Sequence, residues 1–589
     1  MNRSATSVRI LIAALQRRIA QAALLGTLAS AILPAMAIAA GITGSKHDLS
    51  AAGPGKVTAS SETEICIFCH APHNSAGDAP RWNRYSPGTT YTPYNSSTVK
   101  APIGQPTGSS KLCLSCHDGT VALGMVRNRA TPIAMSGGVV RMPAGPSNLG
   151  TDLSDDHPIS FTYDATLAAH SGELRDPAAL PSAVRIGKDG QLQCTACHDA
   201  HNNQYGSFLV MNNARSALCT TCHVKTYWIT TDHSTSTKTW NGQLPDPWPH
   251  TEATTVAANG CENCHAPHTA GTGPRLLNFA KEEDNCYPCH NGNAAAKNIQ
   301  REFAKSSVHP VARSAGIHDP MEDAVNPPRH VECEDCHNPH AAMSAATPTA
   351  PAASGPLAGV RGIDATGKVV TQLDNEYELC FRCHADSRDR GAARVRRQFP
   401  ETNTRLEFAP ANSSYHPVEA NGKNAEVPSL LSGYRASSRI SCTDCHNNDQ
   451  GPRAGGGGPD GPHGSTYVPL LERRLLLTDL SRHSTANFAL CYKCHNSASI
   501  LSDASFPDHN KHVVDEKTAC TTCHDPHGVP SVPHLINFNL DYVSANSEGK
   551  LEYIATGTLQ GTCSLRCHDV DHKDQSYGNM QLRRMRRGH

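Results

Sequence analysis

All 24 cysteines of the chain lie in pairs, and a histidine directly follows the second cysteine of every pair. Eleven pairs have two residues between the cysteines, and the last pair has three. With the shorter spacing, one helical turn can present both thiols to the vinyl groups of a porphyrin and the next imidazole to its iron. The pattern therefore predicts twelve covalently attached haem c groups. In chain order, the motifs are Cys66, Cys69 and His70; Cys113, Cys116 and His117; Cys194, Cys197 and His198; Cys219, Cys222 and His223; Cys261, Cys264 and His265; Cys286, Cys289 and His290; Cys333, Cys336 and His337; Cys380, Cys383 and His384; Cys442, Cys445 and His446; Cys491, Cys494 and His495; Cys520, Cys523 and His524; Cys563, Cys567 and His568.

Two other chemistries also use paired cysteines. A disulfide framework gives no reason for a histidine after every pair, and a zinc site joins one cysteine pair to a distant second ligand pair. Both are therefore disfavoured here. The last motif is the weakest, but the extra residue between Cys563 and Cys567 can bulge without the loss of either thioether.

A further histidine stands three residues after the first motif in five of the six motif pairs. Three extended residues span about 10 Å, whereas the Cα atoms of two histidines on opposite faces of one iron stand roughly 12 Å apart. We therefore expect these histidines to complete a neighbouring haem, which holds two haems close together. In the fifth pair a glycine-rich insertion, 455–458, precedes the equivalent His463, for which His483 is the alternative. The five regular positions are His73, His201, His268, His340 and His527.

A second set of histidines precedes the motif pairs, one for each pair. Three of them belong to a His-Pro dipeptide, namely His157, His309 and His416. The other three candidates are His47, His250 and His512. His233 competes for the place of His250, and His509 competes for the place of His512. Together the two sets supply twelve distal ligands, one for each predicted iron.

The motif pairs divide the chain into six two-haem modules. Aromatic residues make up only 5% of the chain, which holds 45 glycines and 40 prolines, so porphyrins must supply much of the apolar interior. We predict a multihaem cytochrome c fold, mostly irregular coil with short α-helices wrapped around a haem chain and little β-structure. The predicted boundaries are a signal peptide over 1–39 and modules over 40–147, 148–232, 233–300, 301–405, 406–503 and 504–589.

The N-terminal segment predicts export. Arginines at positions 3, 9, 17 and 18 precede an apolar run over 19–40 that ends in small residues, as in a secretory signal peptide. An uncleaved anchor is the alternative, because the run is long enough to span a membrane. No later segment approaches 18 apolar residues, so we expect a mature chain without a membrane span, in the periplasm or secreted.

The charge of the chain argues against nucleic acid as a partner. The formal net charge is −1. Removal of the signal-peptide arginines and addition of two propionates and one ferric charge per haem bring it to roughly −17. The exception is the arginine-rich tail over 583–587, which is either solvated or docked on an acidic neighbour.

Several stretches of the chain resemble the doubled-CxxCH multihaem c-type cytochromes of dissimilatory metal-reducing and iron-oxidising bacteria. They are Cys-Ile-Phe-Cys-His-Ala-Pro-His-Asn over 66–74, Leu-Cys-Leu-Ser-Cys-His-Asp-Gly-Thr over 112–120 and Asp-Asp-His-Pro-Ile-Ser-Phe over 155–161. The resemblance implies bis-histidine haems and electron transfer across the periplasm or outside the cell, sometimes in filaments. It also implies other redox proteins, periplasmic or outer-membrane cytochromes, as partners.

Three functions are compatible with these motifs. An electron carrier or conduit is favoured, because two histidines per iron close both axial positions and leave no site for a substrate. A haem reductase of a small oxyanion or nitrogen oxide needs one open position, and the chain has a histidine for each. We therefore expect no catalytic residues and no enzyme activity. A conducting filament formed by self-association is the third function, which the sequence does not separate from a soluble carrier.

Overall fold

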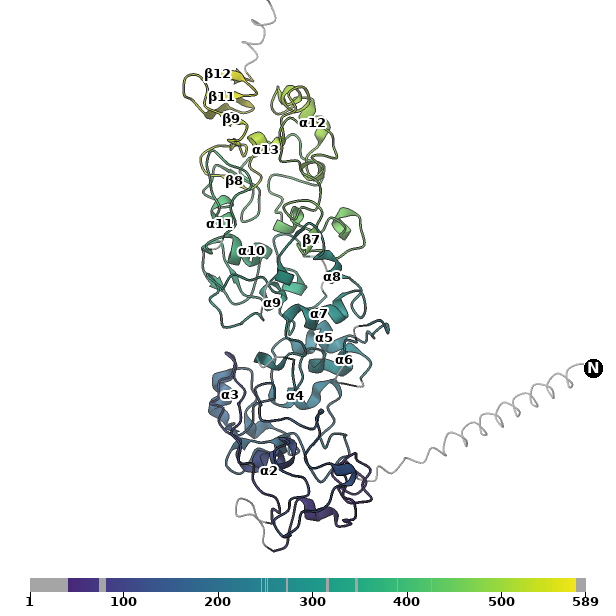
Figure 1. The fold of residues 1–589 in the computed structure, drawn as a ribbon. Coiled ribbons are helices and arrows are strands. Elements are labelled where there is room, and N and C mark those ends of the chain that lie inside the picture. Colours follow the sequence, from purple (N-terminus) through teal and green to yellow (C-terminus); the bar gives the residue numbers. More distant parts are fainter. Residues whose placement is uncertain are drawn as a thin grey trace, which may run out of the picture.

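A computed structural model describes residues 41–73, 81–244, 246–248, 251, 253–271, 274–313, 317–344, 348–388, 390–424 and 426–578. The chain forms an elongated body along which the sequence advances from one end to the other (Figure 1). Residues near the N-terminal end of the described chain, in purple, lie opposite the yellow C-terminal strands. The predicted signal peptide, His250 and the arginine-rich tail lie outside the described residues.

Short helices and long coil connections make up most of the described chain, which confirms the predicted fold class. Glycine and proline are frequent, so few segments can sustain more than two helical turns. The α-helices are α2 (Gly108–His117), α3 (Ala165–Ser171), α4 (Ala217–Cys222), α5 (Asp232–Thr235), α6 (Val256–Asn259), α7 (Glu282–His290), α8 (Ile299–Glu302), α9 (Cys333–Cys336), α10 (Glu376–His384), α11 (Thr404–Glu407), α12 (Ser497–Leu501) and α13 (Cys520–Cys523).

Most strands are two residues long and join in antiparallel pairs. The pairs are β1 (Phe161–Thr162) with β2 (Gln191–Leu192), β3 (Ser307–Val308) with β7 (Gly464–Ser465), β4 (Gly362–Ile363) with β5 (Val369–Val370), and β6 (Ser414–Tyr415) with β8 (Gly528–Val529). Two of these pairs link distant parts of the sequence. Val308 pairs with Gly464 and Tyr415 pairs with Gly528, so histidines adjacent to these residues are brought side by side.

The C-terminal end carries the one longer sheet of the described chain. Its order is β10-β11-β12, with β9 also paired to β11. The strands are β9 (Val543–Ser544), β10 (Glu552–Gly557), β11 (Gln560–Cys567) and β12 (Val570–Tyr577). The sequence does not predict this sheet, because the last cysteine pair, Cys563 and Cys567, is similar to the helical motifs that precede it.

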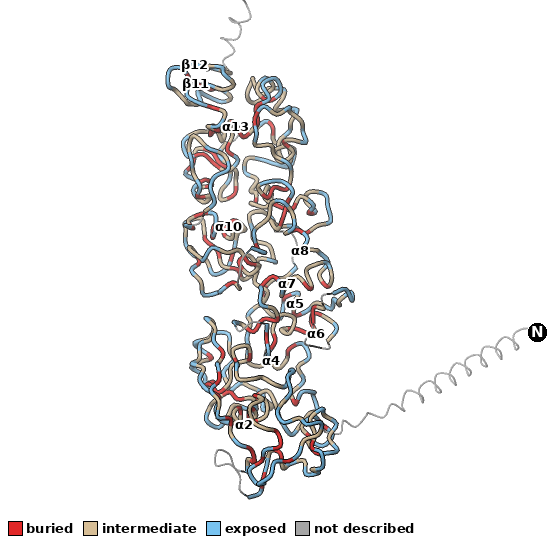
Figure 2. The backbone as a smooth tube through the Cα atoms, in the orientation of Figure 1, coloured by how far each residue is buried: buried red, intermediate tan, exposed pale blue. Residues whose placement is uncertain are grey.

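Hydrophobic side chains gather in small separate clusters within the described residues. One cluster joins α10 to β4 through Phe381 and Ile363, and another surrounds Leu192 of β2. Figure 2 shows the buried residues as short patches distributed along the whole tube. The apolar interior is therefore divided among many local sites. Among the described helices, none has the length and apolar character needed to cross a membrane.

Candidate haem-binding sites

Eleven of the cysteine motifs lie on helical turns, and we number the twelve motifs as sites 1 to 12 in chain order. Sites 2, 4, 6, 7, 8 and 11 lie on α2, α4, α7, α9, α10 and α13, and the others up to site 10 lie on 3₁₀ turns such as Cys194–Ala196. The backbone N–H of the motif histidine donates to the carbonyl of the first cysteine, as from His70 to Cys66 at 2.8 Å and from His337 to Cys333 at 2.9 Å. This turn brings the thiols and the imidazole together.

Each motif histidine of sites 1 to 11 faces an imidazole from elsewhere in the chain, with ring centroids 6.0–6.5 Å apart. A nitrogen ligand binds a transition metal at about 2 Å, so two imidazoles on opposite sides of one ion have centroids roughly 6 Å apart. The separations fit an iron between each pair. The pairs are His70 with His201, His117 with His47, His198 with His268, His223 with His157, His265 with His340, His290 with His233, His337 with His463, His384 with His309, His446 with His527, His495 with His416 and His524 with His509.

The odd-numbered sites 1 to 9 take their facing imidazole from the next module, whereas site 11 takes His509 from its own module. His201 of the second module faces His70 of the first, and His268 of the third module faces His198 of the second. The same shift by one module places His340, His463 and His527 opposite the motif histidines of sites 5, 7 and 9. Each module therefore contributes a histidine to the odd-numbered site of the module before it.

The even-numbered sites 2 to 10 take their facing imidazole from the segment upstream of the motif pair. Four of these upstream histidines approach the carbonyl that directly precedes one of the shifted histidines. The Nδ1 of His309 lies 2.9 Å from the carbonyl oxygen of Pro462, next to His463. His233 makes the same contact with Pro339 at 2.9 Å. Because a carbonyl only accepts, Nδ1 must donate, which leaves Nε2 free to bind a metal.

In many motif histidines, too, Nδ1 lies at a backbone carbonyl, which leaves Nε2 free to bind a metal. Nδ1 of His117 lies 2.7 Å from the carbonyl oxygen of Ser147, and Nδ1 of His265 lies 2.8 Å from that of Arg275. His337 makes the equivalent contact with the carbonyl oxygen of Pro356 at 3.0 Å. Such a hydrogen bond fixes the tautomer and the ring orientation of a metal-binding imidazole.

Carboxylates support two of the shifted histidines. Nδ1 of His268 lies 3.0 Å from Asp156, and Nδ1 of His527 lies 3.0 Å from Glu407. Burial lowers the pKa of His527, but the hydrogen bond to Glu407 and the negative charges of Glu407 and Asp525 together offset this, so the pKa is raised overall. The carboxylate thus makes the His527 ring more basic and a stronger ligand.

Most of the facing imidazoles are partly buried, and the pKa of many of them is lowered, which favours the neutral form. Burial, with the charge of neighbouring histidines, lowers the pKa of His223 to about 3 and that of His446 to about 4. The same causes lower the pKa of His463 to about 3. A neutral imidazole is the form that binds a metal ion, so these side chains are held ready for coordination.

Contacts between cysteines of different motifs show which sites are neighbours. The Cys113 thiol of site 2 hydrogen bonds to Cys194 of site 3, and Cys219 of site 4 hydrogen bonds to Cys261 of site 5. The same contact joins sites 6 and 7, sites 8 and 9, and sites 10 and 11. Within modules the second cysteines are neighbours, as Cys69 is to Cys116. The twelve attachment sites therefore follow one another in sequence order along the elongated body.

Site 12 differs from the others. Cys563 and Cys567 lie on β11, and His568 and Asp569 form the turn into β12 with positive φ angles of 48° and 62°. Nε2 of His568 lies 2.8 Å from Oδ2 of Asp479, away from any described imidazole. Instead, His572 of β12 faces His512, with ring centroids 6.4 Å apart. The sequence does not predict a role for His572, although the extra residue between Cys563 and Cys567 indicates that the helical motif geometry ends at this site.

Three histidines that the sequence offers as distal ligands do not belong to these facing pairs, namely His73, His483 and His250. His73 is exposed, and no imidazole of the described residues lies across from it. His483 hydrogen bonds to the Tyr492 hydroxyl through Nε2 at 2.9 Å, whereas His463 faces His337. His250 cannot be placed, and His233 faces the motif histidine of site 6.

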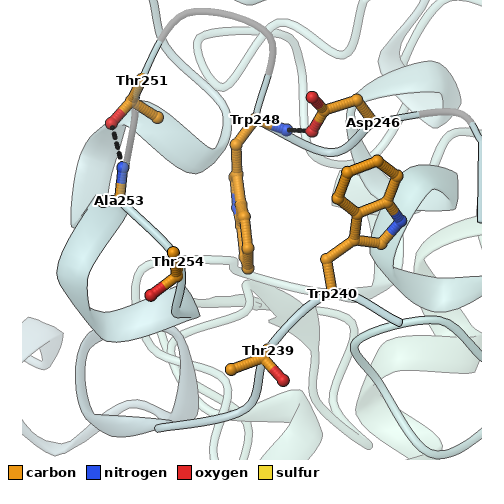
Figure 3. Close-up of a pocket in the computed structure, with 7 residues that line it drawn as sticks. All are labelled: Thr239, Trp240, Asp246, Trp248, Thr251, Ala253 and Thr254. Atoms are coloured by element: carbon orange, nitrogen blue, oxygen red, sulfur yellow. Dashed lines mark hydrogen bonds between the residues drawn. The ribbon is translucent and has the colours of Figure 1, made fainter. Parts of the chain in front are cut away.

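A hollow beside site 6 offers an apolar wall. Figure 3 shows Trp240 and Trp248 on two sides of it, with Thr239 and Thr254 at its base. Both indoles belong to a cluster that includes Cys289 of site 6. Their N–H groups are satisfied elsewhere, by Gln243 and Asn263 at 2.6 Å each, so the ring surfaces remain available for apolar contact with a porphyrin.

Comparisons with known families agree with this geometry. Residues 187–226 and 254–295 match the doubled CXXCH motif family, and residues 364–535 match the family described as outer membrane cytochrome MtrC/MtrF-like, domains II/IV. The chain is a multihaem c-type cytochrome. No curated protein matches the cytochrome. Its matched segments cover sites 3 to 6 and sites 8 to 11, and the facing imidazoles extend the same arrangement through the segments between them.

Proposed function

We propose that the cytochrome binds twelve haem c groups and conducts electrons between its two ends. The observation that carries this proposal is the order of the attachment sites, in which the cysteines of each site adjoin those of the next. Bound haem supplies reversible one-electron chemistry at its iron. The chain's own part is to fix the sites in a row and to exclude water from the buried imidazoles.

We further propose that each iron has two histidine ligands. Sites 1 to 11 use the facing pairs described above, and site 12 uses His512 and His572 in place of His568. Two imidazoles on every iron leave no axial position for a substrate, which favours an electron carrier over a reductase. The low polarizability of nitrogen ligands relative to methionine sulfur favours low reduction potentials.

The proposed location is the periplasm or the cell exterior, with export directed by the signal peptide over 1–39. The match of residues 364–535 to outer-membrane cytochromes supports this location. The proposed partners are other redox proteins, such as periplasmic or outer-membrane cytochromes. The negative charge expected for the haem-loaded protein favours partner surfaces that carry lysine and arginine.

Haem loading is tested by intact mass spectrometry of the secreted protein. We expect the mass of twelve haems, and of eleven in the double variant Cys563→Ser/Cys567→Ser. Electron paramagnetic resonance of the oxidised protein should then show low-spin iron only. A stoichiometric high-spin signal, with rapid turnover of nitrite or another small oxyanion, contradicts the carrier and supports a reductase.

Conduction is tested by the current through single molecules held between two electrodes. The variant Cys286→Ala/Cys289→Ala removes site 6 from the middle of the row, so we expect the current to fall at least tenfold while the other haems remain. The exposed His170→Ala is the matched control and should leave the current unchanged. Equal currents in both variants contradict a single conducting row.

A filament is the second candidate, and two histidines favour it. His73 of the first module faces no imidazole of the described residues, and site 11 is faced by His509 of its own module, unlike the odd-numbered sites before it. In a head-to-tail polymer, His73 of one copy would replace His509 at site 11 of the next. Electron cryomicroscopy should then show filaments for the native chain and for His509→Ala, and only single molecules for His73→Ala. Filaments of His73→Ala contradict this contact.

A further inference from the structure

A cluster of two histidines and two carboxylates lies beside site 7 and uses none of the imidazoles that face one another at the haem sites. His318, Glu322 and His330 come from the connection between α8 and α9, and Asp335 comes from α9 between the two cysteines of site 7. One ligand atom from each of the four side chains lies within 4.8 Å of all the others. Neither histidine has a haem site opposite it, so the haem arrangement leaves this cluster without a role.

The buried ligand atoms of this cluster lack hydrogen-bond partners. His318 and Glu322 have side chains only 7% and 4% exposed. Nδ1 of His318, Nε2 of His330 and both carboxylate oxygens of Glu322 are buried and make no hydrogen bond. Glu322 has ion-pair neighbours at 3.3–3.6 Å but no hydrogen bond, and a buried carboxylate without one is costly, so a shared ion would stabilise these atoms.

The spacing of the four groups is that of ligands around one ion. Nδ1 of His318 lies 3.3 Å from Glu322 and 3.2 Å from Asp335. Nε2 of His330 lies 3.4 Å from Glu322 and 3.5 Å from Asp335. His318 faces Oε1 of Glu322 and Oδ1 of Asp335, whereas His330 faces Oε2 and Oδ2, so each carboxylate lies between the two imidazoles. With one ligand atom from each side chain, the four atoms lie within 4.8 Å of one another, which is close enough for them to converge on one zinc ion.

We propose that His318, Glu322, His330 and Asp335 bind one structural zinc ion. Imidazole and carboxylate are ligands that zinc accepts, and four protein ligands close its tetrahedral shell. The two carboxylates balance the charge of the ion. Arg382 of α10 lies 3.6 Å from Glu322 and 3.5 Å from Asp335, outside the tetrahedron, where it orients the carboxylates.

The zinc ion joins three haem-attachment helices. Asp335 lies within α9 of site 7, and Arg382 on α10 of site 8 donates to the Asp335 carbonyl as well as to its side chain. The backbone N–H of His318 donates to Glu282 at the start of α7, which carries site 6, at 2.8 Å. The site therefore anchors the loop over 317–332 at the junction of sites 6, 7 and 8, and it is not a place for substrate.

The second histidine-carboxylate cluster of the described chain does not carry the same inference. Glu407, Asp525 and His527 also lie close together. However, His527 faces the motif histidine of site 9, and its Nδ1 is already paired with Glu407. That cluster belongs to a haem site.

The test is elemental analysis of the haem-loaded protein by plasma mass spectrometry after dialysis against chelating resin. We expect one zinc per chain in addition to the haem iron. His330→Gln and Glu322→Gln should lower the zinc content at least tenfold with an unchanged haem count, whereas the exposed His170→Ala keeps it. X-ray absorption at the zinc edge should show two imidazoles and oxygen ligands without sulfur.

Three results would overturn the proposal. They are a native protein that holds less than about a tenth of a zinc ion per chain even after incubation with zinc, variants that keep their zinc, and zinc with sulfur ligands. Because the two glutamine variants are assayed for haem content and zinc content together, a folding defect is recognised by a loss of both. In that case X-ray absorption of the native protein alone decides, since it needs no substitution.

Discussion

The imidazoles of His337 and His463 lie nearly parallel, with an angle of 13° between their planes and 6.0 Å between their centroids. The antiparallel pair of β3 and β7 holds the segment that carries His463, because Val308 pairs with Gly464 directly after it. Nδ1 of the adjacent His309 donates to Pro462. Two ligands of consecutive haem sites are thus held by one two-residue strand pair.

His463→Ala should open one axial position at site 7 and produce one high-spin haem that binds carbon monoxide. The glycine-rich insertion does not prevent this ligation, since a doubling of loop length costs only about 0.6 kcal/mol. His483→Ala is the control, because His483 hydrogen bonds to Tyr492 and faces no motif histidine. The measurement is the absorption spectrum of the reduced protein with and without carbon monoxide. The reverse result assigns His483 as the ligand.

His572→Ala should likewise produce one carbon-monoxide-binding haem, at site 12. His568→Ala should leave all haems low-spin, because His568 lies in the β11–β12 turn and is bound to Asp479. Magnetic circular dichroism of the two variants distinguishes them. A high-spin haem in His568→Ala, with none in His572→Ala, returns the ligand role to the histidine that follows the cysteine pair.

Glu407→Gln should raise the reduction potential of one haem, at site 9. The carboxylate of Glu407 accepts the Nδ1 proton of His527 and makes the ring a stronger electron donor to the iron. The neutral amide keeps the shape and removes this effect. Spectroelectrochemical titration should show one haem shifted to a more positive potential, and Asp541→Asn, at an exposed carboxylate, should show none.

Arg84→Leu should destabilise the N-terminal end of the protein by several kcal/mol. The guanidinium of Arg84 is fully buried and donates to the carbonyls of Leu123, Ser115 and Ala122 at 2.8–3.1 Å. Each carbonyl left unpaired costs about 1–3 kcal/mol. Thermal unfolding followed at the haem absorption bands should show the loss, while Arg127→Leu, at a side chain that lies over the Tyr85 ring, should cost less than about 1 kcal/mol.

Acidification from pH 7 to pH 4 should lower the stability of the protein. Burial lowers the pKa of His446 and His524 to about 4, from the ordinary histidine value of 6.5. Between these values the unfolded chain binds more protons than the folded chain, so the free energy of unfolding falls with the pH. Each such histidine contributes up to about 1.4 kcal/mol per pH unit. Denaturant titrations across this range measure the slope, and a flat profile contradicts the prediction.

The haem attachment sites could be predicted from the sequence because their residues are adjacent in the chain. The choice between His463 and His483 was also guided by a local signal, the Gly-Pro-His-Gly segment. By contrast, the choices between His233 and His250 and between His509 and His512 depend on coil segments, which carry no periodic pattern that fixes their course.

Neither the C-terminal hairpin nor the cluster of His318, Glu322, His330 and Asp335 could be predicted from the sequence, and the physical reasons differ. In the hairpin, cross-strand pairing of β11 with β12 brings in His572, and the turn at His568 and Asp569 has no Asn-Gly or Asp-Gly signal. In the cluster, Glu322 and Asp335 resemble ordinary surface carboxylates in the sequence. Only the packing of the connection against α9 and α10 buries them beside His318 and His330.

The shift of ligands by one module gives the chain a direction of assembly. Because the polypeptide is synthesised from its N-terminus, the proposed ligand His201 is made one module after site 1, and the proposed ligand His268 is made one module after site 3. We expect each growing intermediate to carry one odd-numbered site, in its last module, that lacks its second histidine. That histidine is supplied when the next module is made. Maturation then proceeds module by module from the N-terminal end. Chains shortened after module two, three or four should each hold a single carbon-monoxide-binding haem, always in the last module made.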